Sequence, residues 1–488
     1  MIRVAVLGAT GYVGGRLVPE LLGAGGDVRC IVRNPRRTGG FGWREQVEVL
    51  PGDVLDRDSL EAGFEGVDAV YYLVHAMGHS DRFAETDRQG AVNTAAAAQA
   101  AGVGRIVYLG GLGADDPAVL SPHLASRHEV GRLLANGSVP VTELRAAVII
   151  GSGSASFEML RHLVDVLPAM TCPRWVTRTR CQPIAIGDVL HYLVAAPQVE
   201  VLAGQITEVG GRDVVSYRDM MDRYAVATGL RPRVIIPVPV LTPRLSSHWV
   251  RLVTPLPYDL ARPLVDSLIN DVVVSPERDI RRFVDHEPLD LDAALARALQ
   301  RVQDLDVQTA WMGSSLDRTV AGPMPQDPPW AGGTVLADER VLTSEASAEA
   351  LFATVSGVGG DRGWYVAQSL WELRGALDAL AGGVGMRRGR RHPDELRVGD
   401  ALDYFRVETL EAPRLLRLRA EMRLPGVAFL EWHIAEEDGR RTLRQLARMY
   451  PRGVLGRLYW WALFPIHSLI FRLLAKRLVL AAEARPPD

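Results

Sequence analysis

Lysine is almost absent from this sequence. The one lysine of the 488 residues is Lys476, so nearly all of the 55 basic residues are arginine. An arginine keeps its proton in proteins, whereas a lysine can release one. No chemical step that needs a lysine side chain is therefore available to residues 1–475.

Cysteines are few, and an excess of basic charge is missing. Cys30, Cys172 and Cys181 are too few and too scattered for a disulfide framework, which predicts a reducing, cytoplasmic location. They lack the paired spacing of zinc ligands, so no metal is predicted. The net charge of −3 lacks the basic excess that nucleic-acid binding requires.

Long hydrophobic runs are lacking as well. The most apolar stretch, residues 458–471, is shorter than the roughly 20 residues of a membrane-spanning helix and contains Pro465 and His467. We predict no signal peptide and no transmembrane segment. Peripheral contact of residues 458–477 with a membrane surface remains an alternative to a buried helix face. The oligomeric state is left open.

A glycine-rich turn follows the first apolar run. Residues 2–7 have the pattern of a buried strand, Gly8, Gly11 and Gly14 are spaced G-x-x-G-x-x-G, and helical spacing continues from residue 16. Strand, glycine turn and helix in this order indicate a dinucleotide site, with the pyrophosphate at the helix N-terminus. The residues predicted to hold it are Gly8, Thr10, Gly11, Tyr12, Val13 and Gly14.

Arginine stands where an acidic residue would select NAD. The second strand, residues 28–32, is followed by Arg33, with Arg36 and Arg37 close behind. A guanidinium pairs with the 2′-phosphate of NADP, so NADP is favoured over NAD. Solvated loop charges are the alternative interpretation.

Strands then alternate with helices, and residues 141–150 are predicted to be the sixth strand. This alternation predicts an α/β domain with a doubly wound parallel sheet. The segments GATGYVGGRL, GDVLD, DAVYYLVHAMG and AGVGRIVYLGGLG together resemble the atypical short-chain dehydrogenase/reductase superfamily, closest to its NmrA-like NAD(P)-binding branch. The resemblance covers about residues 1–300 and implies a Rossmann-type fold. It also implies that Asn93 lies on the central helix and that Asp53 and Val54 lie beside the adenine. By the same resemblance, Leu73, Val74 and His75 pass the nicotinamide-side ribose, and Gly110 is a further expected cofactor contact.

The usual catalytic residues of that superfamily are replaced here. Its serine position falls at Gly110–Gly111, and its Tyr-x-x-x-Lys pair falls on His123 and Arg127. The spacing of four places both side chains on one helix face. We expect His123 to act as the general acid and Arg127 as its orienting cation, holding a ribose hydroxyl or a phosphate. The alternative is a domain that binds cofactor without chemistry.

Three further regions follow along the chain. Residues 183–300 are expected to form a small substrate lobe that completes a first domain, 1–305. Its Pro-rich walls between residues 233 and 263 suggest a mostly apolar pocket. Residues 306–333 gather Pro and Gly and are predicted to be a linker.

His75 and His79 lie in a loop pattern and are interpreted as an ordinary loop pair.

Residues 334–488 are predicted to form an α+β domain. A strand and two helices precede four strands of alternating polarity, and a long helix, 455–482, ends the chain. This order is similar to a helix-grip domain of the START/polyketide-cyclase type, which implies an apolar ligand between sheet and final helix. The segments 363–391 and 458–471 also resemble an uncharacterised bacterial domain that follows NAD(P)-binding domains.

The function predicted from the sequence is an NADP(H)-dependent oxidoreductase of atypical short-chain type. Its substrate would be a carbonyl, enone or quinone of an apolar small molecule. The alternative is a non-catalytic NAD(P)-binding sensor or accessory protein whose second domain binds a hydrophobic ligand. A membrane-edge accessory protein, like the Rossmann subunit of respiratory complex I, is a third interpretation.

Overall fold

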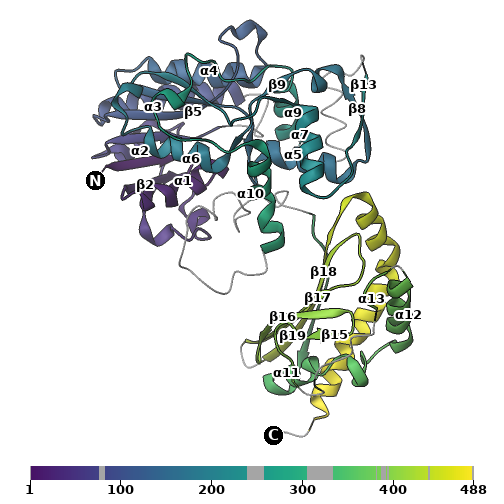
Figure 1. Cartoon of the computed structure of the whole chain (residues 1–488). Coiled ribbons are helices and arrows are strands. Elements are labelled where there is room, and N and C mark those ends of the chain that lie inside the picture. The colour runs from purple at the N-terminus through teal and green to yellow at the C-terminus, as the bar shows by residue number, and fades with distance from the viewer. Residues whose placement is uncertain are drawn as a thin grey trace. The chain divides into compact units, whose positions relative to one another are not determined.

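The computed structural model describes residues 2–75, 83–238, 258–304, 334–380, 382–385, 392, 395–437 and 440–485. The chain divides into two compact units, Met1–Gly332 and Gly333–Asp488, drawn purple to green and green to yellow in Figure 1. Each unit has its own hydrophobic core. The predicted linker, 306–333, lies outside the described residues.

A parallel seven-stranded sheet forms the centre of the first unit. Its order is β11-β6-β5-β4-β1-β2-β3, so the chain reverses direction across the sheet between β1 and β4. Loops that leave these two neighbouring strands diverge there, which makes this edge the usual place for a ligand. The strands are β1 (Arg3–Leu7), β2 (Asp27–Val32), β3 (Glu48–Pro51), β4 (Ala69–Tyr72), β5 (Arg105–Gly111), β6 (Val141–Ala146) and β11 (Ile206–Val209).

Helices cover both faces of this sheet. α1 (Tyr12–Gly23) and α6 (Ile186–Ala195) share one core cluster with alternate residues of the strands. The opposite face is covered by α2 (Arg57–Phe64), α3 (Phe83–Ala100) and α4 (Pro122–Ala135). The predicted doubly wound parallel sheet is therefore confirmed (Figure 1).

A second core forms a lobe beside the carboxyl ends of the strands. Its helices are α5 (Ala155–Val166), α7 (Tyr217–Ala227), α9 (Tyr258–Ser267) and α10 (Leu291–Asp304). β8 (Ala169–Pro173) pairs with β13 (Val234–Val238), β9 (Arg180–Cys181) with β12 (Val215–Ser216), and β10 (Ile184–Ala185) with β7 (Ile149–Ile150). Residues 239–257 of the predicted pocket wall lie outside the described residues.

One predicted strand is wrong in its extent. Residues 141–150 do not form a single strand, because the chain leaves the central sheet after Ala146. β6 pairs on both sides, with β5 and β11, whereas β7 pairs with β10 in a separate ladder. The apolar run therefore serves two sheets.

The second unit is an antiparallel six-stranded sheet with helices on one side. The strand order is β14-β19-β18-β17-β16-β15. A buried bond network joins the sheet to the final helix: Trp432 donates to Gln445, and the Gln445 amide donates to the Phe471 carbonyl. The elements are β14 (Leu336–Ser344), α11 (Ala348–Ser356), α12 (Gln368–Leu380), β15 (Ala401–Leu402), β16 (Phe405–Glu411), β17 (Leu415–Ala420), β18 (Gly426–Glu437), β19 (Arg440–Pro451) and α13 (Gly453–Glu483).

The predicted antiparallel strands and long final helix of this unit are thus confirmed, with ends that differ by a few residues. α13 runs along the sheet, where Leu474 and Leu478 are fully buried (Figure 1). Among the described residues, no helix is long and apolar enough to cross a membrane.

Candidate active site

The glycine turn after β1 has the geometry that a phosphate cradle needs. Gly8 has a φ of +89°, a conformation that favours glycine, and a Cβ there would lie 2.8 Å from the Leu73 carbonyl oxygen. A Cβ on Gly14 would lie 2.2 Å from the Gly8 carbonyl oxygen, so α1 packs directly on the turn. Gly11 is the N-cap residue and offers no capping side chain. The first amides of α1 are thus available to an anion, and the turn fits a pyrophosphate.

A buried arginine joins this turn to the start of the lobe. Arg16 is 2% exposed, its guanidinium lies 4.2 Å from the centre of the Tyr12 ring, and it donates to the Ser152 carbonyl at 3.0 Å. A Cβ on Gly151 would lie 2.4 Å from the Tyr12 hydroxyl. Sequence reasoning missed Arg16, because only the fold brings residue 152 to α1.

The arginines after β2 lie on an ordered turn. Asn34 caps a short 3-10 helix, Pro35–Thr38, by accepting a hydrogen bond from the Arg36 amide. The side chains of Arg33, Arg36 and Arg37 are exposed. Because β2 is the neighbour of β1, the turn follows the strand next to the glycine cradle. This is the position expected for selection of a ribose phosphate.

The residues predicted beside the adenine follow β3. Asp53 Oδ1 accepts from the Leu55 amide at 3.0 Å, and the Val54 carbonyl accepts from Asn93 Nδ2 at 2.9 Å. Asn93 lies on α3, as the resemblance implied. The second of these bonds holds the loop after β3 against the central helix α3. The contact with adenine stays a prediction.

Leu73, Val74 and His75 follow β4 at the point where the sheet reverses direction. β1 and β4 pair in register, with Leu7 opposite Tyr72, so Leu73 lies against Gly8. His75 is two residues further along the chain. The predicted loop partner His79 lies outside the described residues.

A chain of three side chains starts at His75. Its Nδ1 lies 2.8 Å from Asp87 Oδ2, and its Nε2 lies 3.2 Å from His123 Nδ1. Asp87 lies on α3 and His123 on α4, two helices that pack against each other. Sequence reasoning missed Asp87, because it is twelve residues from His75 with no local pattern linking the two. We call Asp87, His75 and His123 the histidine relay.

The hydrogen bonds of the relay determine where its protons lie. An ionised Asp87 accepts, so His75 carries its proton on Nδ1 and its Nε2 is an acceptor. His123 then donates from Nδ1, which leaves His123 Nε2 as the basic atom of the neutral relay. Burial lowers the pKa of His75, and burial, His75 and Arg127 together lower the pKa of His123 well below its ordinary value. Both rings are therefore neutral near pH 7.

Arg127 lies one turn beyond His123 on α4 and contacts the backbone of two neighbouring strand ends. Its guanidinium donates to the backbone carbonyls of Leu109 and Val74 and lies over the Tyr108 ring. It is 9% exposed and braces the ends of β4 and β5. The expected contact with a ribose hydroxyl or a phosphate stays a prediction. The charge of Arg127 also contributes, after burial and His75, to the lowered pKa of His123.

Gly110 and Gly111, where the resemblance places the serine, are packed closely against neighbouring side chains. A Cβ on Gly110 would lie 3.0 Å from Glu143 Oε1, and one on Gly111 would lie 2.8 Å from Leu124. Tyr71, Tyr72 and Tyr108 are buried, and burial raises the pKa of each hydroxyl. Among the described residues, no group of His, Cys, Asp and Glu is arranged to hold a metal ion.

Comparison with known proteins places two family models on the chain. Residues 8–151 match the model described as NAD(P)H-binding. Residues 330–474 match the model described as "Protein of unknown function (DUF2867)". Each model covers the core part of one structural unit.

Individual proteins and solved structures are similar to about half of this chain or more. A ceramide reductase of Caulobacter vibrioides is 29% identical over 239 residues, which is 48% of this chain and 72% of that protein. An uncharacterized protein of Mycobacterium tuberculosis is 26% identical over 242 residues, 49% of this chain but a quarter (25%) of that protein. The structure of a Citrobacter triphenylmethane reductase aligns with a TM-score of 0.50 and 18% identity, over 62% of this chain and all (100%) of that one. That structural likeness shows the fold alone.

The chain therefore combines a Rossmann-fold unit that matches an NAD(P)H-binding family model with a second unit that matches the DUF2867 model.

Substitution of Gly14 tests the cradle. In Gly14→Ala the new methyl meets the Gly8 carbonyl, so α1 must move and NADPH affinity is expected to fall on the order of tenfold or more. Titration of NADPH fluorescence measures this. Gly187→Ala, in helix α6 with nothing within 4 Å of the new methyl, should bind NADPH as the parent does. Unchanged binding in Gly14→Ala would contradict the assignment.

Acid should destabilise the first unit through buried histidines. Burial lowers the pKa of His128 to about 4, against about 6.5 in an unfolded chain. Below pH 6.5 the unfolded state alone takes up the proton, so the free energy of unfolding should drop by about 2 kcal/mol from this residue between pH 7 and pH 5. Urea unfolding at both pH values measures this drop. His128→Gln, which can keep the bond to the Gly111 carbonyl, should reduce it; identical pH dependence in both proteins would refute the prediction.

Proposed function

We propose that the protein is an NADP(H)-dependent oxidoreductase that reduces a carbonyl, enone or quinone of an apolar small molecule. The observation that carries this proposal is the histidine relay at the point where the sheet reverses direction. His75 is two residues beyond Leu73, and Leu73 touches the first glycine of the cradle. A proton-handling group at the nicotinamide end of a dinucleotide site is what carbonyl reduction requires.

The proposed chemistry divides between cofactor and protein. Bound NADPH supplies a hydride. The protein supplies the proton from His123 Nε2 to the developing oxyanion, and the His123 ring becomes neutral as it does so. While His123 carries its second proton, its Nδ1–H donates to His75 Nε2 and the His75 Nδ1–H donates to Asp87. The carboxylate thus stabilises the positive charge through two rings.

Arginine replaces lysine in this scheme without replacing its proton chemistry. Arg127 keeps its proton and its hydrogen bonds to the ends of two strands. Its charge lowers the pKa of His123, which makes the protonated ring a stronger acid and a less populated one at neutral pH. Reduction should therefore be favoured at mildly acidic pH.

The second unit is proposed to be a helix-grip domain. Its antiparallel sheet and the long α13 that crosses it support this proposal. The rival function is a sensor in which the nucleotide changes conformation without turnover. The same assays decide between the two, because a sensor would bind NADPH tightly and oxidise it with none of the carbonyl compounds.

Substitutions in the relay test the proton role. With NADPH and a panel of quinones, enones and aldehydes, His123→Ala should lower kcat about 10²- to 10⁴-fold, the usual contribution of a general acid. Absorbance of NADPH measures turnover. His191→Ala, at an exposed histidine on α6, should keep parental activity. Full activity in His123→Ala would exclude His123 as the acid.

Asp87 is proposed as a positioning residue, so its test is a pH profile. Rate should decline as pH rises from 6 to 8, because protonated His123 becomes scarcer. Asp87→Asn removes the charge that stabilises this form and should shift the declining limb to lower pH, with NADPH affinity unchanged. A lower rate with no shift of the limb would indicate a structural role only.

Arg33 is the residue proposed to select NADP. Arg33→Ala should weaken NADPH binding by about tenfold, the worth of one charge-assisted contact, and leave NADH binding unchanged. Titration of both nucleotides measures the ratio. Arg57→Ala, an exposed arginine at the start of α2, serves as the control for loss of general positive charge. Equal effects on the two nucleotides would refute the selectivity.

A further inference from the structure

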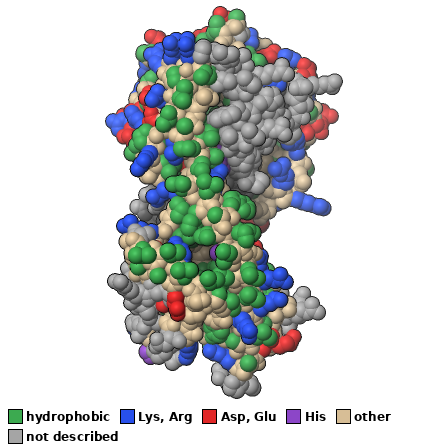
Figure 2. Space-filling model, turned by 90° about the vertical axis from the view of Figure 1, so that its right-hand side faces the viewer, with side chains coloured by type: hydrophobic (Ala, Val, Ile, Leu, Met, Phe, Trp, Pro, Cys, Tyr) green, Lys and Arg blue, Asp and Glu red, His purple; other side chains and the backbone are tan. Residues whose placement is uncertain are grey.

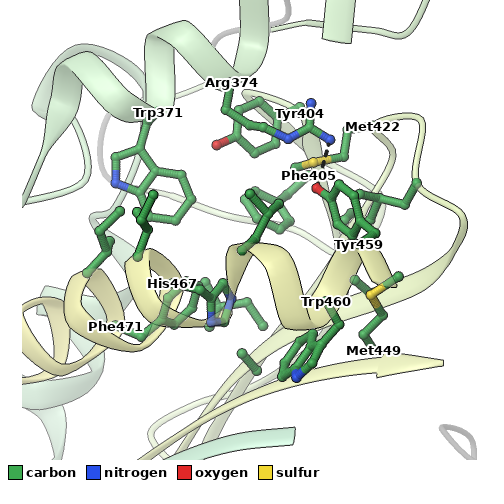
Figure 3. A pocket seen from close by; sticks show the side chains of 18 of the residues that line it. Trp371, Arg374, Tyr404, Phe405, Met422, Met449, Tyr459, Trp460, His467 and Phe471 are labelled. Carbon is green, nitrogen blue, oxygen red and sulfur yellow. Dashed lines mark hydrogen bonds between the residues drawn. The ribbon is translucent and has the colours of Figure 1, made fainter. Parts of the chain in front are cut away.

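The second unit encloses a cavity between its sheet and its last two helices. Its volume is about 280 Å³, near the lower limit of about 300 Å³ for small-molecule sites. Leu430 and Met449 of the sheet form the floor together with Tyr404, which lies in the turn between β15 and β16; they are 2%, 1% and 0% exposed. Figure 3 shows side chains of α13 and of α12 closing it from the other sides, among them Trp371, Trp460 and Phe471. The cavity is apolar over almost its whole lining.

The rim of the cavity is apolar and open to solvent. Leu373 and Leu377 of α12 and Ile466 of α13 line the cavity, yet 54%, 52% and 56% of their surface is exposed. Figure 2 shows hydrophobic side chains gathered around a hollow on this face of the second unit. An apolar molecule can therefore enter between α12 and α13 without passing charged groups first.

A few polar groups belong to the lining of the cavity. The hydroxyl of the fully buried Tyr404 has no hydrogen-bond partner among the described residues. Arg374 donates to the Tyr459 hydroxyl at 3.2 Å, and in Figure 3 the Tyr404 hydroxyl points away from this bond. An unpaired buried hydroxyl is costly, so a partner atom from outside the chain is the expected explanation.

Arg374 also supplies the uncompensated charge of the cavity. It forms no ion pair with any of the residues that the structure describes. The second arginine in the lining, Arg448, lies 3.6 Å from the carboxylate of Glu431. Burial lowers the pKa of His467 to about 4, so this ring is neutral near pH 7. Among the described residues of the lining, Arg374 is therefore the positive charge without a carboxylate partner.

We propose that this cavity binds an amphiphile with an unbranched apolar tail and an acidic head, a carboxylate or a phosphate. The tail lies between the sheet and α13, and the head accepts hydrogen bonds from Arg374 and Tyr404. The site belongs to the second unit, so the proposal stands or falls independently of the reductase function. It assigns a ligand to a domain for which the matching family model carries no function.

Calorimetric titration of the full chain with dodecanoate, dodecyl phosphate and 1-dodecanol, each below its micellar concentration, tests the proposal. One acidic amphiphile should bind saturably at one site per chain, about tenfold tighter than the alcohol, as a charge-assisted bond implies. The stronger of the two acids identifies the head group. Absence of saturable binding, or equal binding of acid and alcohol, would overturn the proposal.

Single substitutions distinguish binding in the cavity from nonspecific electrostatic attraction to the protein. Arg374→Gln should abolish the preference for the acid, whereas Arg472→Gln, at an exposed position on α13 outside the cavity lining, should preserve it. Tyr404→Phe should weaken binding of the acid several-fold while the free protein unfolds at the same or a higher temperature, because an orphan hydroxyl has been removed. An equal loss of the preference for the acid in Arg374→Gln and Arg472→Gln would contradict the proposed site. Undiminished binding of the acid by Tyr404→Phe would also contradict it.

Discussion

The pair of hydrogen bonds that joins Asp87, His75 and His123 is the interaction on which the account of this protein depends. It connects a loop after β4 with the two helices α3 and α4. Because Leu73 touches Gly8, the same loop connects the relay with the cofactor cradle. Without these contacts the domain would remain a dinucleotide-binding fold with no proton donor at its ligand edge.

The absence of lysine explains why the relay matters. A chain with no lysine in residues 1–475 has no group that can do what a catalytic lysine does. Arg127 occupies the corresponding helix position but donates to backbone carbonyls, so it fixes the ends of β4 and β5 and acts on His123 through its charge. In the proposed mechanism, Arg127 therefore has a structural and an electrostatic role, and the histidines transfer the proton.

Local patterns predicted most of the fold. Alternating strands and helices, the glycine turn and the period-two strands of the second unit are all encoded within short segments, and each was predicted in its place. The break after Ala146 was missed, because an apolar run looks the same whether it serves one sheet or two. His123 was singled out because the resemblance places the superfamily's Tyr-x-x-x-Lys pair on His123 and Arg127. Asp87 and Arg16 could not be, because their partners come together only through the packing of distant elements.

The two units concentrate their unusual polar groups in different ways. In the first, two half-buried histidines bond to each other and one of them to a carboxylate, and we interpret them as a neutral relay with one basic nitrogen. In the second, a buried hydroxyl and an arginine without an ion pair among the described residues face an apolar cavity. The histidine relay can carry a proton, and the Tyr404 hydroxyl has no hydrogen-bond partner among the described residues. These two features, more than the folds that contain them, carry the chemistry proposed for the chain.

Nitrogen NMR of the histidine rings at pH 7 tests the central claim most directly. The account predicts that His75 and His123 are both neutral and both carry their proton on Nδ1, the less common form of free histidine. It also predicts that His123 Nε2 has the shift of a bare acceptor nitrogen. A His123 ring that is doubly protonated at pH 7, or that carries its single proton on Nε2, would contradict the relay.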